Sequence, residues 1–130
     1  MEKINTPDVR KTILVIDDQP RNLQLAAHVL NPFYELILAT SGEKGLRIAS
    51  EKLPDLILLD IIMPKLGGFE VMEEINKDPS LKKIPIIIVS NSGQPVELDR
   101  AQKLGAKDWL IKTEFDPKEV IDKVVKQIGK

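Results

Sequence analysis

Five polar side chains of this sequence stand at the ends of short apolar runs and together have the groups needed for chemistry. Asp17 and Asp18 follow the first run, Asp60 the second, Ser90 the third and Lys112 the fourth. An apolar run of about four to eight residues with polar residues at its end is typical of a buried strand. In an open parallel sheet, ligands bind outside the carboxyl ends of the strands. If the runs are neighbouring parallel strands, three carboxylates, a hydroxyl and an ammonium group converge on one site.

The three carboxylates predict a metal site, because acids this close repel one another unless a cation balances them. Oxygen ligands without cysteine or a nearby histidine favour a hard ion, most simply Mg²⁺, with Mn²⁺ as an alternative. The metal and Lys112 would stabilise the oxygens of a phosphoryl group under attack by a carboxylate nucleophile. Ser90 would donate a hydrogen bond to that group. We therefore expect phosphoryl chemistry on Asp60.

Each member of this set also has an ordinary interpretation. Asp18 suits a helix N-cap, a position at which aspartate is favoured. Ser90 alone would be an unremarkable serine at a strand end, and Lys112 alone a solvated surface lysine. The agreement of all four strand ends favours a functional site over these separate readings.

Composition narrows the class of protein. A chain of 130 residues suffices for one domain with its own core. The absence of cysteine excludes disulfides, zinc thiolate sites and a cysteine nucleophile. A formal net charge of -1 gives no reason to expect direct nucleic-acid binding. Neither a membrane span of about 20 apolar residues nor the apolar core of a signal peptide is found. We expect a cytoplasmic protein that makes no direct contact with membrane.

Strand-like and helix-like segments alternate along the chain after a polar lead-in at residues 1–10, and residues 11–130 form the predicted domain. The strands are expected at about 12–17, 34–39, 55–60, 85–90 and 107–112. The helices are expected at about 20–31, 42–52, 67–77, 95–104 and 117–128. Regular alternation with short links predicts an α/β fold with a parallel sheet and helices on both faces. Strands apolar at every position agree with burial on both faces.

Local signals mark several helix boundaries. Pro20 suits the first turn of a helix, where its missing N–H is not needed. Ser41 and Asp116 are predicted N-caps. The single histidine, His28, lies off the stripe expected to face the core, which comprises Leu23, Ala26, Val29 and Leu30. We therefore expect His28 to be a surface residue.

The chain resembles the receiver domain of two-component response regulators over about residues 11–129. The matching residues are Leu14-Val15-Ile16-Asp17-Asp18, Leu59-Asp60-Ile61-Ile62-Met63-Pro64, Gly67-Gly68, Ser90, Leu104-Gly105-Ala106, Trp109 and Lys112. An acid pair, an Asp-x-x-Met-Pro motif and a strand-end lysine rarely occur in this order by chance.

The resemblance implies a flavodoxin-like, doubly wound five-stranded sheet in the order 2-1-3-4-5. It implies that Asp60 accepts a phosphoryl group from a histidine of a sensor kinase or of a histidine phosphotransfer protein. Mg²⁺ would be held by Asp18 directly, by Asp17 largely through water, by Asp60 and by the backbone carbonyl of Ile62. Lys112 would pair with Asp60 and then with the phosphoryl group.

Ser90 and Trp109 match the hydroxyl and aromatic positions that rearrange together on activation. The implied protein is a stand-alone signalling switch, with slow self-dephosphorylation and altered binding of a downstream protein, and not an enzyme acting on other substrates. The helix at 95–104, the strand at 107–112 and the last helix match the surface on which relatives bind targets or dimerise.

Four positions depart from the commonest pattern of the family. Ser90 replaces a threonine and lacks the β-branch that stiffens χ1. Asn91 replaces a small residue, and its larger side chain is expected to change the access of water to an acyl phosphate. Trp109 is bulkier than the usual tyrosine or phenylalanine. Thr113 replaces a proline, so we expect a trans peptide bond after Lys112 and an altered loop.

Two other functional classes share some of these features. An aspartate-nucleophile phosphatase typically carries Asp-x-Asp after its first strand, whereas here Gln19 stands two residues after Asp17. A degenerate receiver that acts as a phosphorylation-independent docking module usually lacks an acid of the pair, the acceptor or the lysine. All of these are present in this sequence.

Overall fold

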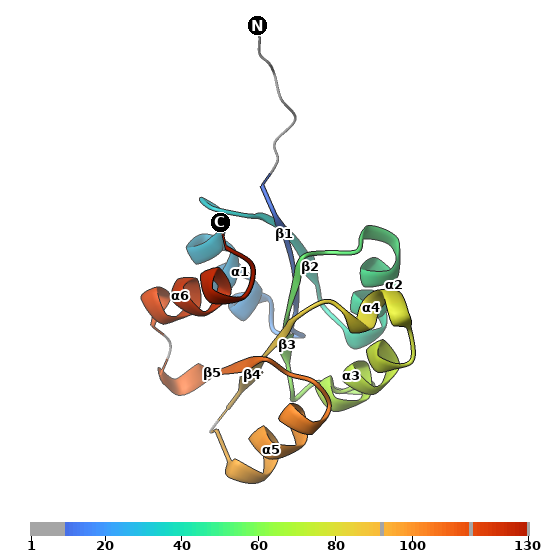
Figure 1. Ribbon diagram of the computed structural model, residues 1–130. Helices are drawn as coiled ribbons and strands as arrows, with labels where there is room; N and C mark the ends of the chain where they lie inside the picture. The colour runs from blue at the N-terminus through green and yellow to red at the C-terminus, as the bar shows by residue number, and fades with distance from the viewer. Residues whose placement is uncertain (1–9, 92, 115, 130) are drawn as a thin grey trace, which may run out of the picture.

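The computed structural model describes residues 10–91, 93–114 and 116–129. The strands are β1 (Thr12–Ile16), β2 (Glu35–Ala39), β3 (Leu56–Asp60), β4 (Ile86–Ser90) and β5 (Asp108–Ile111). The helices are α1 (Pro20–Leu30), α2 (Gly42–Lys52), α3 (Gly68–Asn76), α4 (Pro79–Lys82), α5 (Pro95–Lys103), the 3₁₀ helix η1 (Lys112–Glu114) and α6 (Pro117–Ile128). All strands pair in parallel, in the order β2-β1-β3-β4-β5 (Figure 1). The predicted fold class and strand order are confirmed.

The register of the sheet brings the strand ends into line. Ile16 pairs with Leu59, and Asp60 pairs with Val89 of β4. Ser90 in turn pairs with Ile111, the residue before Lys112. The polar residues that end or follow β1, β3, β4 and β5 therefore lie along one edge of the sheet.

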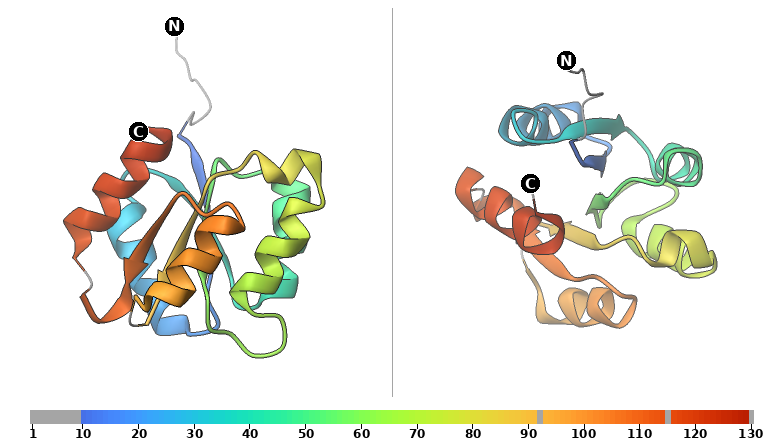
Figure 2. Two further views of the ribbon diagram at one scale, coloured as in Figure 1. Left: turned by 60° about the horizontal axis from the view of Figure 1, so that its bottom comes forward. Right: turned by 45° about the horizontal axis from the view of Figure 1, so that its top comes forward.

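Helices cover both faces of the sheet, as Figures 1 and 2 show. One face packs against α1 and α6, and the other against α2, α3, α4 and α5. Alternation along β1 explains the two cores, because Leu14 points to one face while Ile13 and Val15 point to the other. Burying each such aliphatic side chain contributes roughly 1.5–3 kcal/mol to folding.

Most of the predicted helix signals are confirmed. Pro20 begins α1, and this helix buries the predicted stripe of Leu23, Ala26, Val29 and Leu30. The Ser41 hydroxyl accepts from the main-chain N–H of Lys44, and the Asp116 carboxylate accepts from that of Lys118. His28 is exposed, as expected. The N-cap of α1 is Gln19, so the structure does not use Asp18 as the cap.

The structure differs from the predicted elements in a few places. Helix α4, a single turn whose N-cap is Asp78, was not predicted from the sequence. Four residues are too few to produce a helical hydrophobic period, so no pattern marked this turn. The strand predicted at 107–112 ends at Ile111, and Lys112 begins the 3₁₀ turn instead. The described backbone contains no cis peptide bond, in agreement with the trans bond expected after Lys112.

No helix within the described part of the chain is long and apolar enough to cross a membrane. Residues 1–9 of the predicted lead-in lie outside the described residues, and Arg10 is exposed.

Candidate functional site

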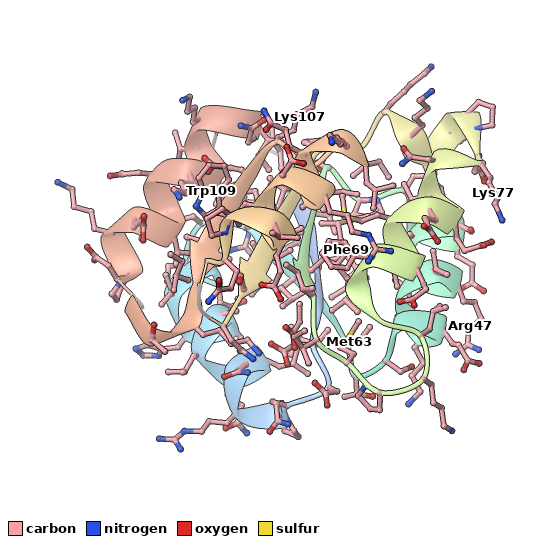
Figure 3. The ribbon with its side chains drawn as sticks, turned by 90° about the horizontal axis from the view of Figure 1, so that it is seen from below. Arg47, Met63, Phe69, Lys77, Lys107 and Trp109 are labelled. Carbon is pink, nitrogen blue, oxygen red and sulfur yellow. The ribbon has the colours of Figure 1, made fainter. Side chains whose placement is uncertain are left out.

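The three predicted acids meet at the carboxyl edge of the sheet. Asp17 follows β1, Asp18 is the next residue, and Asp60 is the last residue of β3. One carboxylate oxygen from each lies within 4.8 Å of the others. Figure 3 looks onto this end of the molecule, with Met63 of the β3–α3 loop near its middle.

Asp60 is almost fully buried, with 1% of its surface exposed. Its Oδ2 accepts a hydrogen bond from Lys112 Nζ at 3.1 Å, and its Oδ1 accepts one from the main-chain N–H of Ile62 at 3.2 Å. Burial and the neighbouring charge of Asp17 raise the pKa of Asp60 to about 6, whereas Lys112 and Ile62 act in the opposite direction. The carboxyl group is still mostly ionised at neutral pH.

Asp17 is buried and held by its surroundings. Its Oδ1 accepts from the main-chain N–H of Gln19 at 2.9 Å and, more weakly, from the Asn22 amide at 3.5 Å. Its Oδ2 lies 3.9 Å from Lys112 Nζ. Lys112 therefore faces two acids at once, and its side chain is itself only 22% exposed.

Asp18 is less buried than its neighbours and lines the cleft above the sheet edge. Among the described residues, no protein group forms a hydrogen bond or ion pair with its carboxylate. The cleft has a volume of about 320 Å³ and is also lined by Ile62, Asn91 and Lys112. The departure from the family pattern at Asn91 therefore lies on the wall of the site.

The donor set suits a hard divalent cation. Three carboxylates face one another, and Lys112 is the cation that contacts them within the described residues. One ammonium group leaves net negative charge in a mostly buried site, which a bound Mg²⁺ would balance. The residues therefore fit Mg²⁺, with Asp17, Asp18 and Asp60 as the side chains available to hold it. The carbonyl of Ile62 as a further ligand stays a prediction.

Ser90 is fully buried at the end of β4, but its hydroxyl is engaged elsewhere. Ser90 Oγ donates to Glu97 Oε1 of α5 at 3.1 Å and accepts from the main-chain N–H of Gly93 at 3.0 Å. Sequence reasoning missed Glu97, because an acid in the first turn of a helix is ordinary and nothing in the sequence links it to Ser90.

Trp109 of β5 is 40% exposed and lies where β5 meets α6 (Figure 3). Lys123 Nζ stands 5.6 Å from the centre of the indole ring and donates to the carbonyl oxygen of Trp109. The same ammonium group pairs with Asp108 at 3.2 Å and with Glu119 at 3.4 Å. Trp109 thus rests on the outer surface, held by a residue that the sequence analysis did not single out.

Comparison with known protein families identifies the same family that the site residues indicate. The model of the response regulator receiver domain matches residues 13–125. The chain belongs to this family. It is therefore a receiver domain of two-component signalling, as the sequence motifs predicted.

Curated relatives of this receiver domain include proteins of different lengths. It is 34% identical to Protein PilH of Pseudomonas aeruginosa over 101 residues, covering 77% of this chain and 84% of that protein. It is 36% identical to a probable cyclic di-GMP phosphodiesterase of Vibrio cholerae over 101 residues, covering 78% of this chain but only 23% of the relative.

Several solved structures have a fold that is closely similar to that of this receiver domain. The chemotaxis protein CheY4 of Vibrio cholerae superposes with a TM-score of 0.87 at 26% identity, covering 92% of this chain and 100% of that one. The receiver domain of a sensor histidine kinase from Pseudomonas aeruginosa gives a TM-score of 0.85 at 25% identity, covering 94% and 100%. That domain was solved with a magnesium ion coordinated in its active site cleft.

Proposed function

We propose that this receiver domain is a phosphoacceptor switch in which Asp60 receives the phosphoryl group. The observation that carries the proposal is the buried Asp60 carboxylate with Lys112 Nζ at 3.1 Å and two further carboxylates beside it. A carboxylate that is mostly ionised yet poorly solvated is a better nucleophile than one in water. The same surroundings are poorly suited to a merely structural ion pair, because the acids outnumber the ammonium group.

The reaction follows from the positions of these groups. A carboxylate oxygen of Asp60 attacks phosphorus of a phosphohistidine, the new O–P bond forms, and the P–N bond breaks with its electron pair left on the imidazole nitrogen. Lys112 stabilises the negative charge that builds on the phosphoryl oxygens. Bound Mg²⁺ would supply further charge stabilisation to those oxygens. Water later attacks phosphorus of the acyl phosphate, the O–P bond to Asp60 breaks, and the products are inorganic phosphate and the free Asp60 carboxylate.

The proposed donor is a sensor histidine kinase or a histidine phosphotransfer protein, and a cytoplasmic location is part of the same proposal. The domain would change its affinity for a downstream protein and would not act on other substrates. The surface formed by α5, β5 and α6 is the proposed site of target binding or dimerisation. Its exposed apolar side chains include Val96 and Trp109, which are 81% and 40% exposed.

Intact mass spectrometry tests the proposal. Protein incubated with Mg²⁺ and acetyl phosphate is expected to gain the mass of one phosphoryl group, and Asp60→Asn is expected to gain none. Asp99→Asn, an exposed acid on α5, serves as the matched control and should be phosphorylated like the wild type. Addition of EDTA should suppress the gain.

Two other outcomes would contradict the proposal. Steady hydrolysis of a generic phosphoester without a phosphoprotein would favour a phosphatase. No phosphoprotein with either acetyl phosphate or a phosphorylated histidine phosphotransfer protein would favour a docking module that works without phosphorylation.

A further inference from the structure

The Ser90 hydroxyl, which is expected to donate a hydrogen bond to the phosphoryl group, forms its hydrogen bonds with other residues in this structure. Ser90 has no exposed surface, so solvent does not compete for its hydroxyl. Its oxygen accepts from the N–H of Gly93 and its proton points to Glu97 Oε1, 3.1 Å away. Both the donor and an acceptor function of Ser90 are therefore satisfied within the protein.

A serine hydroxyl has one proton to donate. While Ser90 donates to Glu97, the same proton is not available to a phosphoryl oxygen on Asp60. Glu97 and the phosphoryl group therefore compete for this proton. Because Ser90 is fully buried, water cannot replace either acceptor, so one hydrogen bond forms only when the other breaks. Glu97 lies in the first turn of α5, so the exchange also breaks a contact between β4 and that helix.

We propose that Glu97 is a positioning residue that holds the Ser90 hydroxyl in its resting orientation and thereby opposes activation. This inference rests on the proposed function of Asp60. Transfer of the hydrogen bond from Glu97 to the phosphoryl group releases the first turn of α5 from the end of β4. The state of Asp60 is thereby linked to the surface formed by α5, β5 and α6.

The length of the contact sets the expected size of the effect. At 3.1 Å the bond is long for a hydroxyl donating to a carboxylate, so it belongs to the weaker examples of its kind. Glu97 contributes about one ordinary hydrogen bond to the resting state. Its removal should therefore raise the affinity of the domain for a phosphoryl mimic about threefold to tenfold.

Binding of beryllofluoride in the presence of Mg²⁺, followed by ¹⁹F NMR, measures this affinity without relying on any side-chain reporter. Glu97→Ala is expected to bind about threefold to tenfold more tightly than the wild type. Glu97→Gln keeps an acceptor oxygen and is expected to gain less than the alanine variant. Asp99 is an acid of the same helix that pairs with Lys103 and not with Ser90. The affinity of Asp99→Ala should therefore stay at the wild-type value.

A double-mutant comparison separates the hydrogen bond from a general effect of charge. In a Ser90→Ala background, Glu97→Ala should no longer change the affinity. An unchanged affinity in Glu97→Ala alone, or an equal gain in the Ser90→Ala background, in Glu97→Gln or in Asp99→Ala, would overturn the role of Glu97. If the wild type itself binds no beryllofluoride, the proposed function fails, and the inference fails with it.

Discussion

The chemistry of Asp60 is set by opposed influences from a few neighbouring groups. Burial and Asp17 favour its neutral form, whereas Lys112 and the N–H of Ile62 favour its charged form. The outcome is a pKa of about 6, which leaves a basic carboxylate at neutral pH. A cation that enters the site would favour the charged form further, so occupancy by Mg²⁺ and ionisation of Asp60 should promote each other.

Lys112 is expected to be needed for phosphorylation more than for folding. Lys112→Met keeps much of the apolar stem but removes the charge beside the phosphoryl oxygens, so the rate of phosphorylation by acetyl phosphate should fall by about 10²-fold. Lys103→Met, an exposed lysine of α5, is the control and should keep the wild-type rate. A Lys112→Met rate within about twofold of the wild type, measured by time-resolved intact mass, would show that Lys112 has no such role.

The raised pKa of Asp60 predicts a dependence of stability on pH. The folded protein holds this proton up to about pH 6, whereas the unfolded chain releases it near 3.8. Stability from this group is therefore greatest below about pH 4, falls as pH rises toward 6, and stays low above it. In EDTA at pH 7, Asp60→Asn should raise the free energy of unfolding by about 2–3 kcal/mol.

Urea denaturation of both proteins at pH 7 and near pH 4 measures this difference. The advantage of Asp60→Asn should shrink at the lower pH and also when Mg²⁺ is added at pH 7. An advantage of equal size at both pH values would show that ionisation of Asp60 is not its cause.

At the scale of elements, the start of α3 is fitted closely against the end of β3. A Cβ atom on Gly68 would lie 2.5 Å from the carbonyl oxygen of Asp60 and 2.6 Å from Cα of Ile61. These are backbone atoms, which cannot move aside without displacing Asp60 itself. By contrast, a Cβ atom on Gly67 would meet the flexible end of Glu70 at 2.8 Å.

The pair of glycines gives a matched test of this fit. Gly68→Ala should destabilise the protein by about 1–3 kcal/mol and slow phosphorylation, although alanine favours helix more than glycine does. Gly67→Ala, at the N-cap of α3, should cost less than about 1 kcal/mol. Urea denaturation and the phosphorylation rate of the two variants provide the comparison, and equal stabilities would mean that α3 can shift freely against β3.

Elements with a clear sequence signal were predicted well, whereas contacts between them were not. The buried strands were located because β3 and β4 are apolar at every position before Asp60 and Ser90. Their convergence then followed from parallel topology. The contact of Ser90 with Glu97 depends on how α5 packs and on one side-chain rotamer, and neither leaves a pattern in the sequence. The same holds for Lys123 beside Trp109.

At the scale of the whole molecule, the chain offers a route from the site to the outer surface. It runs from Asp60 at the end of β3 through Ser90 on β4 to α5, and Trp109 lies on β5, the next strand. Phosphorylation is expected to shift the domain between two populated states that differ along this route. The size of the shift is limited by the difference in free energy with which the two states interact with the phosphoryl group.

Trp109 is the single tryptophan and reports on this surface directly. Mg²⁺ with beryllofluoride should change its fluorescence, because the proposed rearrangement would move the indole ring relative to Lys123, which stands 5.6 Å from the ring centre. Asp60→Asn should abolish the response. A titration in which beryllofluoride is seen to bind by ¹⁹F NMR, while the emission of Trp109 stays constant, would show that the site is not coupled to this surface.

Chemical trapping of the acyl phosphate tests the central claim most directly. Borohydride reduces an aspartyl phosphate to homoserine, so peptide mapping by mass spectrometry after phosphorylation and reduction locates the acceptor within the chain. Phosphorylation of Asp60 predicts homoserine at position 60 and intact aspartate at Asp17 and Asp18. Homoserine at position 17 or 18, or at no position in a chain incubated with Mg²⁺ and a competent donor, would contradict it.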